Sequence, residues 1–334
     1  MKQVINTLLF LSLFIGSLFT EDIYAYEGAA AFLKRGMSAR ALGLGGAYTA
    51  LAVDPSAIYW NPAGIANGSG LLLQISDLKD TQFYTNISDV NYPQIAATLS
   101  PTHKFFTSVT FGVGVGFSGF FVNGIEHYDD QSNYLGDLNY SEVAYFMSYA
   151  LAIDNIQLGV SYKYLQQDFG LSQRHSNLTE NKKGTDIGLR YTPVRFLTLA
   201  ITIMDKLKVG EFEYVPKMVT SGIALNFSRL SFVADYTTTE ISFARVKSGL
   251  EYRLGSNNQY SIRVGVRDIP IQDDNEKISD IIELNSKISM GFGYNLVIGN
   301  DRHGLTFDIG MQQEIAPSIL MPYSRIVATT ITIR

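Results

Sequence analysis

The residues that could do enzyme chemistry are scattered along this 334-residue chain. Its four histidines each lie in or beside a predicted connection between strands, at His103, His127, His175 and His303. Neither the H-E-x-x-H metal motif nor the G-x-S-x-G nucleophile motif occurs. The absence of cysteine excludes disulfides, thiolate metal sites and cysteine nucleophiles. We therefore predict a protein that is not an enzyme and that uses no cofactor or metal.

Two carboxylate runs could collect Ca²⁺. They are Asp129-Asp130 and the group of Asp273, Asp274 and Glu276. Neither run has the ligand order of an EF-hand loop. Runs of charge of this kind are usually solvated, so we interpret both as exposed loop residues.

A glycine-rich run near the N-terminus is the most distinctive local pattern. Residues 36–66 read GMSARALGLGGAYTALAVDPSAIYWNPAGIA. Gly43, Gly45 and Gly46 permit close backbone approach or a positive φ, and the run ends in an Asn-Pro-Ala-Gly turn signal. A phosphate-binding loop is excluded because the G-x-x-x-x-G-K-[ST] pattern is missing and no strand is predicted before Gly43.

The composition favours strands and argues against nucleic acid as a partner. Charged residues make up 17% of the chain, whereas about 25% is usual in soluble domains. Tyrosine and phenylalanine number 20 each, and aromatic residues suit a pleated surface. The net charge of −5 supplies no concentrated positive patch for phosphates.

The first 25 residues have the pattern of a signal peptide. Lys2 gives a positive start, Val4 to Phe19 is apolar, and Ala25 ends a plausible cleavage site. A single transmembrane anchor is the alternative, but the apolar run is shorter than the roughly 20 residues that a spanning helix needs. We expect removal after Ala25, and hence export.

From about residue 70 onward, segments of alternating polarity recur to the end of the chain. In the segment 286–298, for example, Ile288, Met290 and Phe292 share one face while Ser289 and Gly291 lie on the other. We predict fourteen such strands: 70–77, 93–100, 106–119, 142–153, 156–167, 184–193, 196–204, 217–227, 230–238, 243–254, 259–267, 286–298, 304–314 and 323–334.

The predicted connections alternate between long and short. Residues 78–92, 120–141 and 268–285 are long connections, whereas 154–155 and 194–195 are tight turns. Long outer loops and short periplasmic turns are typical of outer-membrane barrels. A soluble β-sandwich remains the alternative, with its apolar faces turned inward.

Charged and aromatic residues of the strands carry further expectations. Charge facing lipid near the midplane is costly, so these side chains should point into the lumen and pair there: Arg190, Lys247, Glu251, Arg253, Arg263, Arg267 and Asp308. Aromatic residues near strand ends predict interfacial girdles: Tyr84, Tyr92, Phe105, Phe106, Tyr128, Tyr140, Tyr214 and Tyr323.

The glycine-rich run resembles the N-terminal signature of the PorV/PorQ family and, more distantly, of FadL-type fatty-acid transporters. The matching residues, in order, are Arg40, Gly43, Gly45, Gly46, Ala47, Asp54, Pro55, Ser56, Ala57, Asn61, Pro62, Ala63 and Gly64. Ser324-Arg325-Ile326 is similar to the start of that family's last strand. The chain departs from the pattern in its shorter outer loops and in Arg334, where barrels commonly have an aromatic residue.

The resemblance implies an all-β, fourteen-stranded antiparallel transmembrane barrel in the outer membrane. Residues 1–25 would be the signal peptide, 26–69 a partly helical luminal plug, and 70–334 the barrel. It also implies a lateral path for ligand near a distorted strand. Gly112, Gly114 and Gly116 share one face of the third strand and are the candidates, although a closely packed strand without such a role is the alternative.

Two functions follow from the resemblance. The FadL-type likeness implies transport of small hydrophobic molecules. The PorV/PorQ likeness implies a docking barrel for type IX secretion, with secretion-system proteins as partners and no transported small molecule. A soluble periplasmic or secreted β-protein is the alternative that cell fractionation would settle.

Overall fold

The computed structural model describes residues 30–68, 70–80, 89–101, 109–168, 179–208, 214–239, 244–255, 257–271, 286–298, 303–314 and 325–334. The predicted signal peptide lies outside the described residues. Within those residues, no helix has the length and apolar character needed to cross a bilayer.

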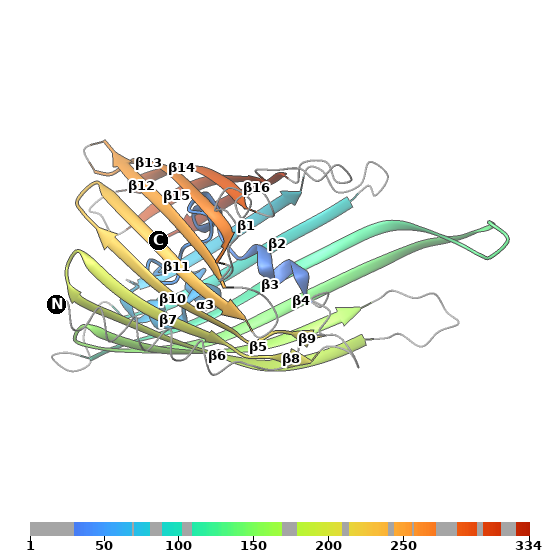
Figure 1. Ribbon diagram of the computed structural model, residues 1–334, viewed down its shortest axis with the longest axis horizontal. Coiled ribbons are helices and arrows are strands. Elements are labelled where there is room, and N and C mark those ends of the chain that lie inside the picture. The colour runs from blue at the N-terminus through green and yellow to red at the C-terminus, as the bar shows by residue number, and fades with distance from the viewer. Residues whose placement is uncertain are drawn as a thin grey trace.

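Fourteen antiparallel strands form one closed barrel (Figure 1). Each strand pairs with its neighbours along the chain, and β1 pairs with β16 to close the circuit. The barrel strands are β1 (Gly70–Asp80), β2 (Asp89–Ser100), β3 (Val109–Tyr128), β4 (Tyr134–Ile153), β5 (Ile156–Asp168), β6 (Thr179–Val194), β7 (Leu197–Met204), β10 (Met218–Asn226), β11 (Leu230–Thr239), β12 (Arg245–Leu254), β13 (Tyr260–Pro270), β14 (Lys287–Ile298), β15 (His303–Glu314) and β16 (Arg325–Ile333). Every predicted strand coincides with one of them, so the predicted fold is confirmed.

The long connection predicted over 120–141 is wrong. Strands β3 and β4 are each 20 residues long and continue as a hairpin whose turn spans residues 129–133. Figure 1 shows this hairpin in green, projecting far beyond the neighbouring strands. The clean alternation stops here because both faces of the ribbon meet water, and Gly124, at φ 73°, lies where the pairing register shifts. A second small sheet, β8 (Leu207–Lys208) with β9 (Tyr214–Val215), lies between β7 and β10.

The outer surface of the barrel is apolar and exposed. Ile75, Met290 and Ile309 have exposed fractions of 56%, 55% and 52%, while their polar neighbours Ser76 and Ser289 are buried at 3% and 0%. The apolar faces therefore point away from the interior, which excludes a soluble sandwich with a dry apolar centre. An even-stranded closed barrel with such an exterior spans a membrane in the manner of outer-membrane barrels, as predicted.

The connections set the orientation of the barrel. At one end they are short, as at 154–155, 195–196 and 227–229. At the other end lie the β3–β4 hairpin and the connection between β7 and β10 that contains β8 and β9. Short turns face the periplasm in outer-membrane barrels, so the hairpin projects on the outer side.

Residues 30–68, the luminal segment, contain four short helices. They are η1 (Ala31–Arg35), α2 (Ala39–Gly43), α3 (Ala57–Trp60) and η2 (Pro62–Asn67). These helices contact the inner faces of the barrel strands, with α2 against β13 to β16 and η2 against β2 to β6. Figure 1 shows these blue ribbons within the ring of strands.

Candidate functional site: the barrel lumen

Short side chains fix the turns of the luminal segment. The Ser38 hydroxyl accepts a hydrogen bond from the backbone N–H of Arg40 at 3.3 Å and caps α2. The Asn61 amide oxygen accepts one from the N–H of Ala63 at 3.1 Å and caps η2, where Pro62 occupies the first turn. The Asp54 carboxylate accepts from the N–H of Ser56 at 3.0 Å and also from the Tyr48 hydroxyl. Capping contributes to α2 and η2, which at five and six residues are too short to be stable through length alone.

The luminal segment packs directly against glycines on the inner wall of the barrel. A Cβ on Gly159 would lie 2.2 Å from the backbone nitrogen of Ala63, and one on Gly188 would lie 2.1 Å from Oδ1 of Asn61. The wall glycines that meet the segment in this way are Gly112, Gly114, Gly116, Gly159, Gly188, Gly222, Gly249, Gly265, Gly291 and Gly310. The lumen is therefore shaped to the backbone of this segment, with no room for side chains at these positions.

The luminal segment also has glycines of its own where its backbone turns sharply or approaches other backbone closely. Gly45 and Gly46 have φ values of 68° and 73°, which L-residues rarely adopt. A Cβ on Gly43 would lie 2.9 Å from the Cα of Gly291. On Gly64 it would lie 1.8 Å from the carbonyl oxygen of Ala52, within the segment itself. Close approach and positive φ, which the sequence predicted for this run, both occur.

A charge network ties α2 to the wall. The Arg40 guanidinium donates from Nε to Oε2 of Glu251 at 2.9 Å and from Nη2 to Oε1 at 3.0 Å. Arg263 donates from Nε to the same carboxylate at 2.7 Å and from Nη1 to Oδ1 of Asp308 at 2.7 Å. Glu251 is 1% exposed, so both of its oxygens are held by arginines away from water.

Three further wall residues hold the segment by hydrogen bonds. Oδ2 of Asp235 accepts from the backbone N–H groups of Tyr48 at 2.9 Å and Thr49 at 3.0 Å. Arg190 donates from Nε to the carbonyl of Ala50 at 3.0 Å. The Gln94 side chain donates to the carbonyl of Gly36 at 2.7 Å. Backbone groups of a segment with little regular structure are satisfied by the barrel, as burial requires.

The predicted inward orientation of the strand charges is confirmed. Arg190, Lys247, Arg263, Arg267 and Asp308 are each 8% exposed or less. Arg253 lies nearer the rim, where its side chain is 24% exposed and donates to the Ser231 hydroxyl at 2.6 Å. Pairing within the lumen, rather than a relay for substrate, accounts for the Arg263, Glu251 and Asp308 contacts.

All nine predicted motif residues lie in the luminal segment and act on its shape or seating: Arg40, Gly43, Gly45, Gly46, Asp54, Asn61, Pro62, Ala63 and Gly64. Arg40 alone among them makes an ion pair with the wall in the described residues. Asn61 also reaches the wall, donating from Nδ2 to the carbonyl of Leu189 at 3.3 Å. The contacts of the motif residues therefore position the luminal segment in the barrel.

The candidate path glycines of β3 lie against this segment. Gly112 meets Ile65, while Gly114 and Gly116 meet Ile58. Their contacts do not test passage of a ligand, so the lateral path stays a prediction.

The pairing of β2 with β3 is interrupted further toward the outer side. Pairs form at Asn91 with Phe121 and at Gln94 with Ser118, and within these described strands none forms at Tyr92 or Pro93. Proline has no N–H to donate to the ladder, which accounts for the gap.

An apolar inner wall lies beside the luminal segment on β1 to β3. Leu78, Tyr92 and Phe120 point inward at neighbouring positions, and the rings of Tyr92 and Phe120 stack with centroids 4.8 Å apart. Tyr140 meets Phe120 edge to face at 5.9 Å, and the Arg35 guanidinium lies 4.6 Å above the Tyr92 ring. Apolar side chains gather on this side of the lumen, whereas buried ion pairs lie on β12 to β15 and, between Lys163 and Asp186, on β5 and β6.

The sequence did not identify this wall, and two of its members were assigned elsewhere. Tyr92 and Tyr140 were predicted for the interfacial girdle, but they face the lumen. Tyr92 is only 5% exposed, because it stands on the inward side of β2 with Gln94. Tyr128 lies in the projecting hairpin instead. Tyr84, Phe105, Phe106 and Tyr323 lie outside the described residues, as does the side chain of Tyr214.

The fold and lumen define a class: a membrane-spanning fourteen-stranded barrel with its N-terminal segment packed inside. No protein-family model and no curated protein matches the sequence. Solved structures do match along nearly the whole chain. The toluene transporter TodX of Pseudomonas putida aligns with a TM-score of 0.60 at 11% identity, covering 94% of this chain and 99% of that one.

Two further structures agree. The toluene transporter TbuX of Ralstonia pickettii gives a TM-score of 0.59 at 15% identity, over 90% of this chain and 98% of that one. A FadL homologue of Pseudomonas aeruginosa gives 0.51 at 13% identity, over 89% and 96%. At this level of identity the likeness shows the fold, which is that of FadL-type outer-membrane barrels.

Proposed function

We propose that this protein is an outer-membrane channel that admits small hydrophobic molecules, with the N-terminal residues 26–69 acting as its plug. The observation that carries the proposal is the two-sided lumen. The Arg40, Glu251, Arg263 and Asp308 network seats α2 on β12 to β15, while another part of the wall, on β1 to β3, carries Leu78, Tyr92 and Phe120. Apolar side chains inside a membrane barrel offer a surface to an apolar solute that water does not provide.

The comparisons support the proposal by analogy of fold. Two of the similar structures are described as toluene transporters, and a third, CymD, as a monoaromatic hydrocarbon channel. A plugged lumen also fits a solute that does not need a wide aqueous pore. For entry we propose a route beside β3, past Gly112, Gly114 and Gly116. The missing pairs at Tyr92 and Pro93 supply a weak point in the wall close by.

Toluene influx into proteoliposomes tests the proposal. We expect vesicles carrying the protein to take up labelled toluene faster than protein-free vesicles, and Phe120→Ala to slow this uptake. Tyr145→Ala is the control, because Tyr145 is an aromatic residue on the lipid-facing side of β4, three positions along from Glu142, the partner of Phe120. Equal uptake by empty and loaded vesicles would contradict the proposal.

A second candidate function is a docking barrel for type IX secretion, as the resemblance to the PorV/PorQ family implies. The projecting β3–β4 hairpin favours it, because it offers a partner an exposed ribbon that includes Tyr134 and Leu135, both 56% exposed. Purification from native membranes tests this candidate. Secretion components should co-purify with the full chain and be lost when residues 124–138 are replaced by a short turn; co-purification that survives the replacement would remove the hairpin as the docking element.

A further inference from the structure

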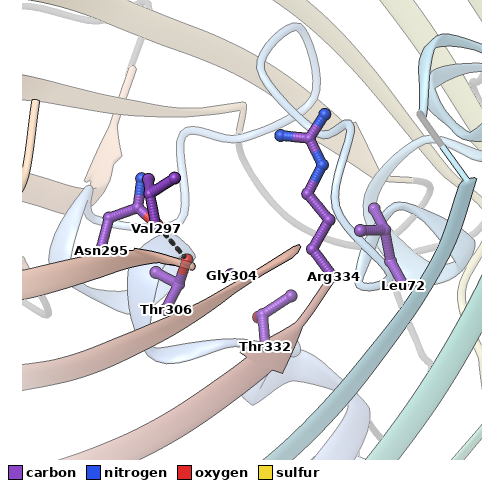
Figure 2. Close-up of a pocket in the computed structure, with 7 residues that line it drawn as sticks. All are labelled: Leu72, Asn295, Val297, Gly304, Thr306, Thr332 and Arg334. Carbon is purple, nitrogen blue, oxygen red and sulfur yellow. Dashed lines mark hydrogen bonds between the residues drawn. The ribbon is translucent and has the colours of Figure 1, made fainter. Parts of the chain in front are cut away.

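A pocket of about 160 Å³ lies at the periplasmic end of the lumen, between β1 and β14 to β16 (Figure 2). It is lined by inward-facing residues of these four strands: Leu72, Asn295, Val297, Gly304, Thr306, Thr332 and Arg334. A cavity of about 150 Å³ holds one benzene ring in a protein, so this pocket has room for a single small ring.

The pocket lies directly beside the seat of α2. On β16 the inward positions Thr330, Thr332 and Arg334 follow one another, and Thr330 accepts a hydrogen bond from the backbone N–H of Ala39 at 2.8 Å. Thr332 and Arg334, the next two positions toward the periplasm, line the pocket. A solute passing the luminal segment on this side would therefore meet the pocket next.

The polar groups of the pocket are suited to donating hydrogen bonds. The Thr306 hydroxyl donates to Oδ1 of Asn295 at 3.3 Å, which leaves the amide nitrogen of Asn295 available to a ligand. Within the described residues, the Arg334 guanidinium has no ion pair or hydrogen bond. No acidic side chain is among the seven lining residues. Leu72, Val297 and the threonine methyl groups supply apolar surface.

The backbone of Arg334 is paired with β15 at the edge of the pocket. The N–H of Arg334 donates to the carbonyl of Gly304 at 2.9 Å, and the N–H of Gly304 donates back at 3.3 Å. Figure 2 shows the guanidinium across the pocket from Asn295, with Leu72 beside it and Thr332 at its base. A guanidinium without an ion pair in the described residues, beside a ring-sized pocket lined by both apolar and polar side chains, favours a ligand that has both a ring and a negative charge.

We propose that this pocket is an exit subsite for small aromatic carboxylates. Its assignment as an exit rests on the proposed transport function, and it extends the proposed solutes from neutral hydrocarbons to ring-bearing anions. The carboxylate would accept from the Arg334 guanidinium and the Asn295 amide, while the ring would lie against Leu72 and Val297.

Equilibrium binding of benzoate to the full-length protein in detergent micelles tests the subsite without requiring transport. We expect saturable binding that Arg334→Gln weakens by about tenfold, because a charge-assisted hydrogen bond is lost. Arg195→Gln is the matched control. It removes the same charge at the same end of the barrel, from the exposed β6–β7 turn, and should leave benzoate binding unchanged.

Two further probes separate the parts of the proposal. Acetate lacks the ring and should bind much more weakly than benzoate, and Thr332→Phe should block benzoate by filling the pocket. Absence of saturable benzoate binding, or equal loss in Arg334→Gln and Arg195→Gln, would overturn the subsite. Because toluene influx is measured separately, a failure of transport with benzoate binding intact would leave the subsite in place and remove only its assignment as an exit.

Discussion

Arg40 of the luminal segment forms a two-point ion pair with Glu251 of the barrel wall, although 211 positions separate them in the sequence. Arg263 shares the same carboxylate from the wall side. The carboxylate thus neutralises two guanidinium groups that would otherwise repel each other in a space away from bulk water. This arrangement makes Glu251 the residue that joins the charge of α2 to the barrel wall.

We predict that Glu251→Gln loosens the luminal segment. Losing one partner of a buried ion pair costs about 3 kcal/mol or more, since the remaining charges stay buried. Hydrogen exchange of residues 39–60 should rise sharply in the variant, while the barrel strands stay protected. Glu126→Gln on the projecting hairpin, whose carboxylate accepts a hydrogen bond from the Tyr128 hydroxyl in water, is the control and should leave the exchange unchanged. Unaltered exchange in Glu251→Gln would show that the network does not hold the segment.

We also predict that Gly64→Ala prevents the segment from folding in place. The added Cβ would lie 1.8 Å from the carbonyl oxygen of Ala52, an atom of the backbone that cannot move aside cheaply. The barrel should still assemble, because Gly64 takes no part in strand pairing. Protease cleavage within residues 39–66 of the folded barrel is the measurement. An intact barrel that resists cleavage as well as the wild type would contradict the prediction.

The pH response of the hairpin turn is a third prediction. The Asp129 carboxylate accepts from the Asn133 side chain at 2.9 Å and from two backbone N–H groups, and these bonds lower the pKa of Asp129 below its ordinary value of 3.8. A lowered pKa means that the carboxylate stabilises the turn above pH 3.8, and that this contribution is lost as the pH falls through the lower value.

A carboxyl titration by NMR checks this sign. Asn133→Ala should move the Asp129 midpoint upward toward 3.8, because the hydrogen bond that contributes most is removed. Asn139→Ala is the matched control. The Asn139 side chain accepts from the backbone N–H of Gly124, away from the turn, so its loss should leave the midpoint in place. A midpoint that stays low in Asn133→Ala would assign the shift to another group.

The sequence predicted the barrel well because a strand's two-residue period is a local property. Ile288, Met290 and Phe292 alternate with Ser289 and Gly291 whatever lies across the lumen, so the inward and outward faces could be assigned from the pattern. The hairpin beyond Phe120 could not be predicted in this way. There both faces meet water, and nothing selects an apolar side.

The lumen was only partly predictable. The inward charges followed from the cost of placing charge in lipid. The tight approach of Gly43 and Gly45 and the positive φ of Gly45 and Gly46 followed from their lack of a side chain. The partners in the ion pairs could not be predicted from the sequence. Arg40 and Glu251 come together only when the barrel closes around the luminal segment. Tyr92 was predicted to lie in the interfacial girdle because it is near the end of a strand. Its side chain points into the lumen instead, because it lies two positions from Gln94 on the same face of β2.

The sharpest test of the membrane assignment is whether hydrocarbon surrounds the outward-facing side chains of the barrel. Ile309 lies outward near the middle of β15, opposite Phe292, and is 52% exposed. Leu135 is equally exposed, at 56%, but lies on the hairpin beyond the barrel. In water these two positions would be equivalent. In a bilayer only Ile309 is surrounded by hydrocarbon, where an arginine costs about 2–4 kcal/mol.

We therefore predict that Ile309→Arg lowers the free energy of unfolding in lipid vesicles by about 2–4 kcal/mol, while Leu135→Arg changes it by less than about 0.5 kcal/mol. Denaturant titration of the protein folded in vesicles measures both values under the same conditions. The comparison removes the effect of the substitution itself, because each variant replaces an exposed aliphatic side chain with the same cation. Equal values for the two variants would mean that hydrocarbon does not surround β15, and the transport and docking proposals would both fall with it.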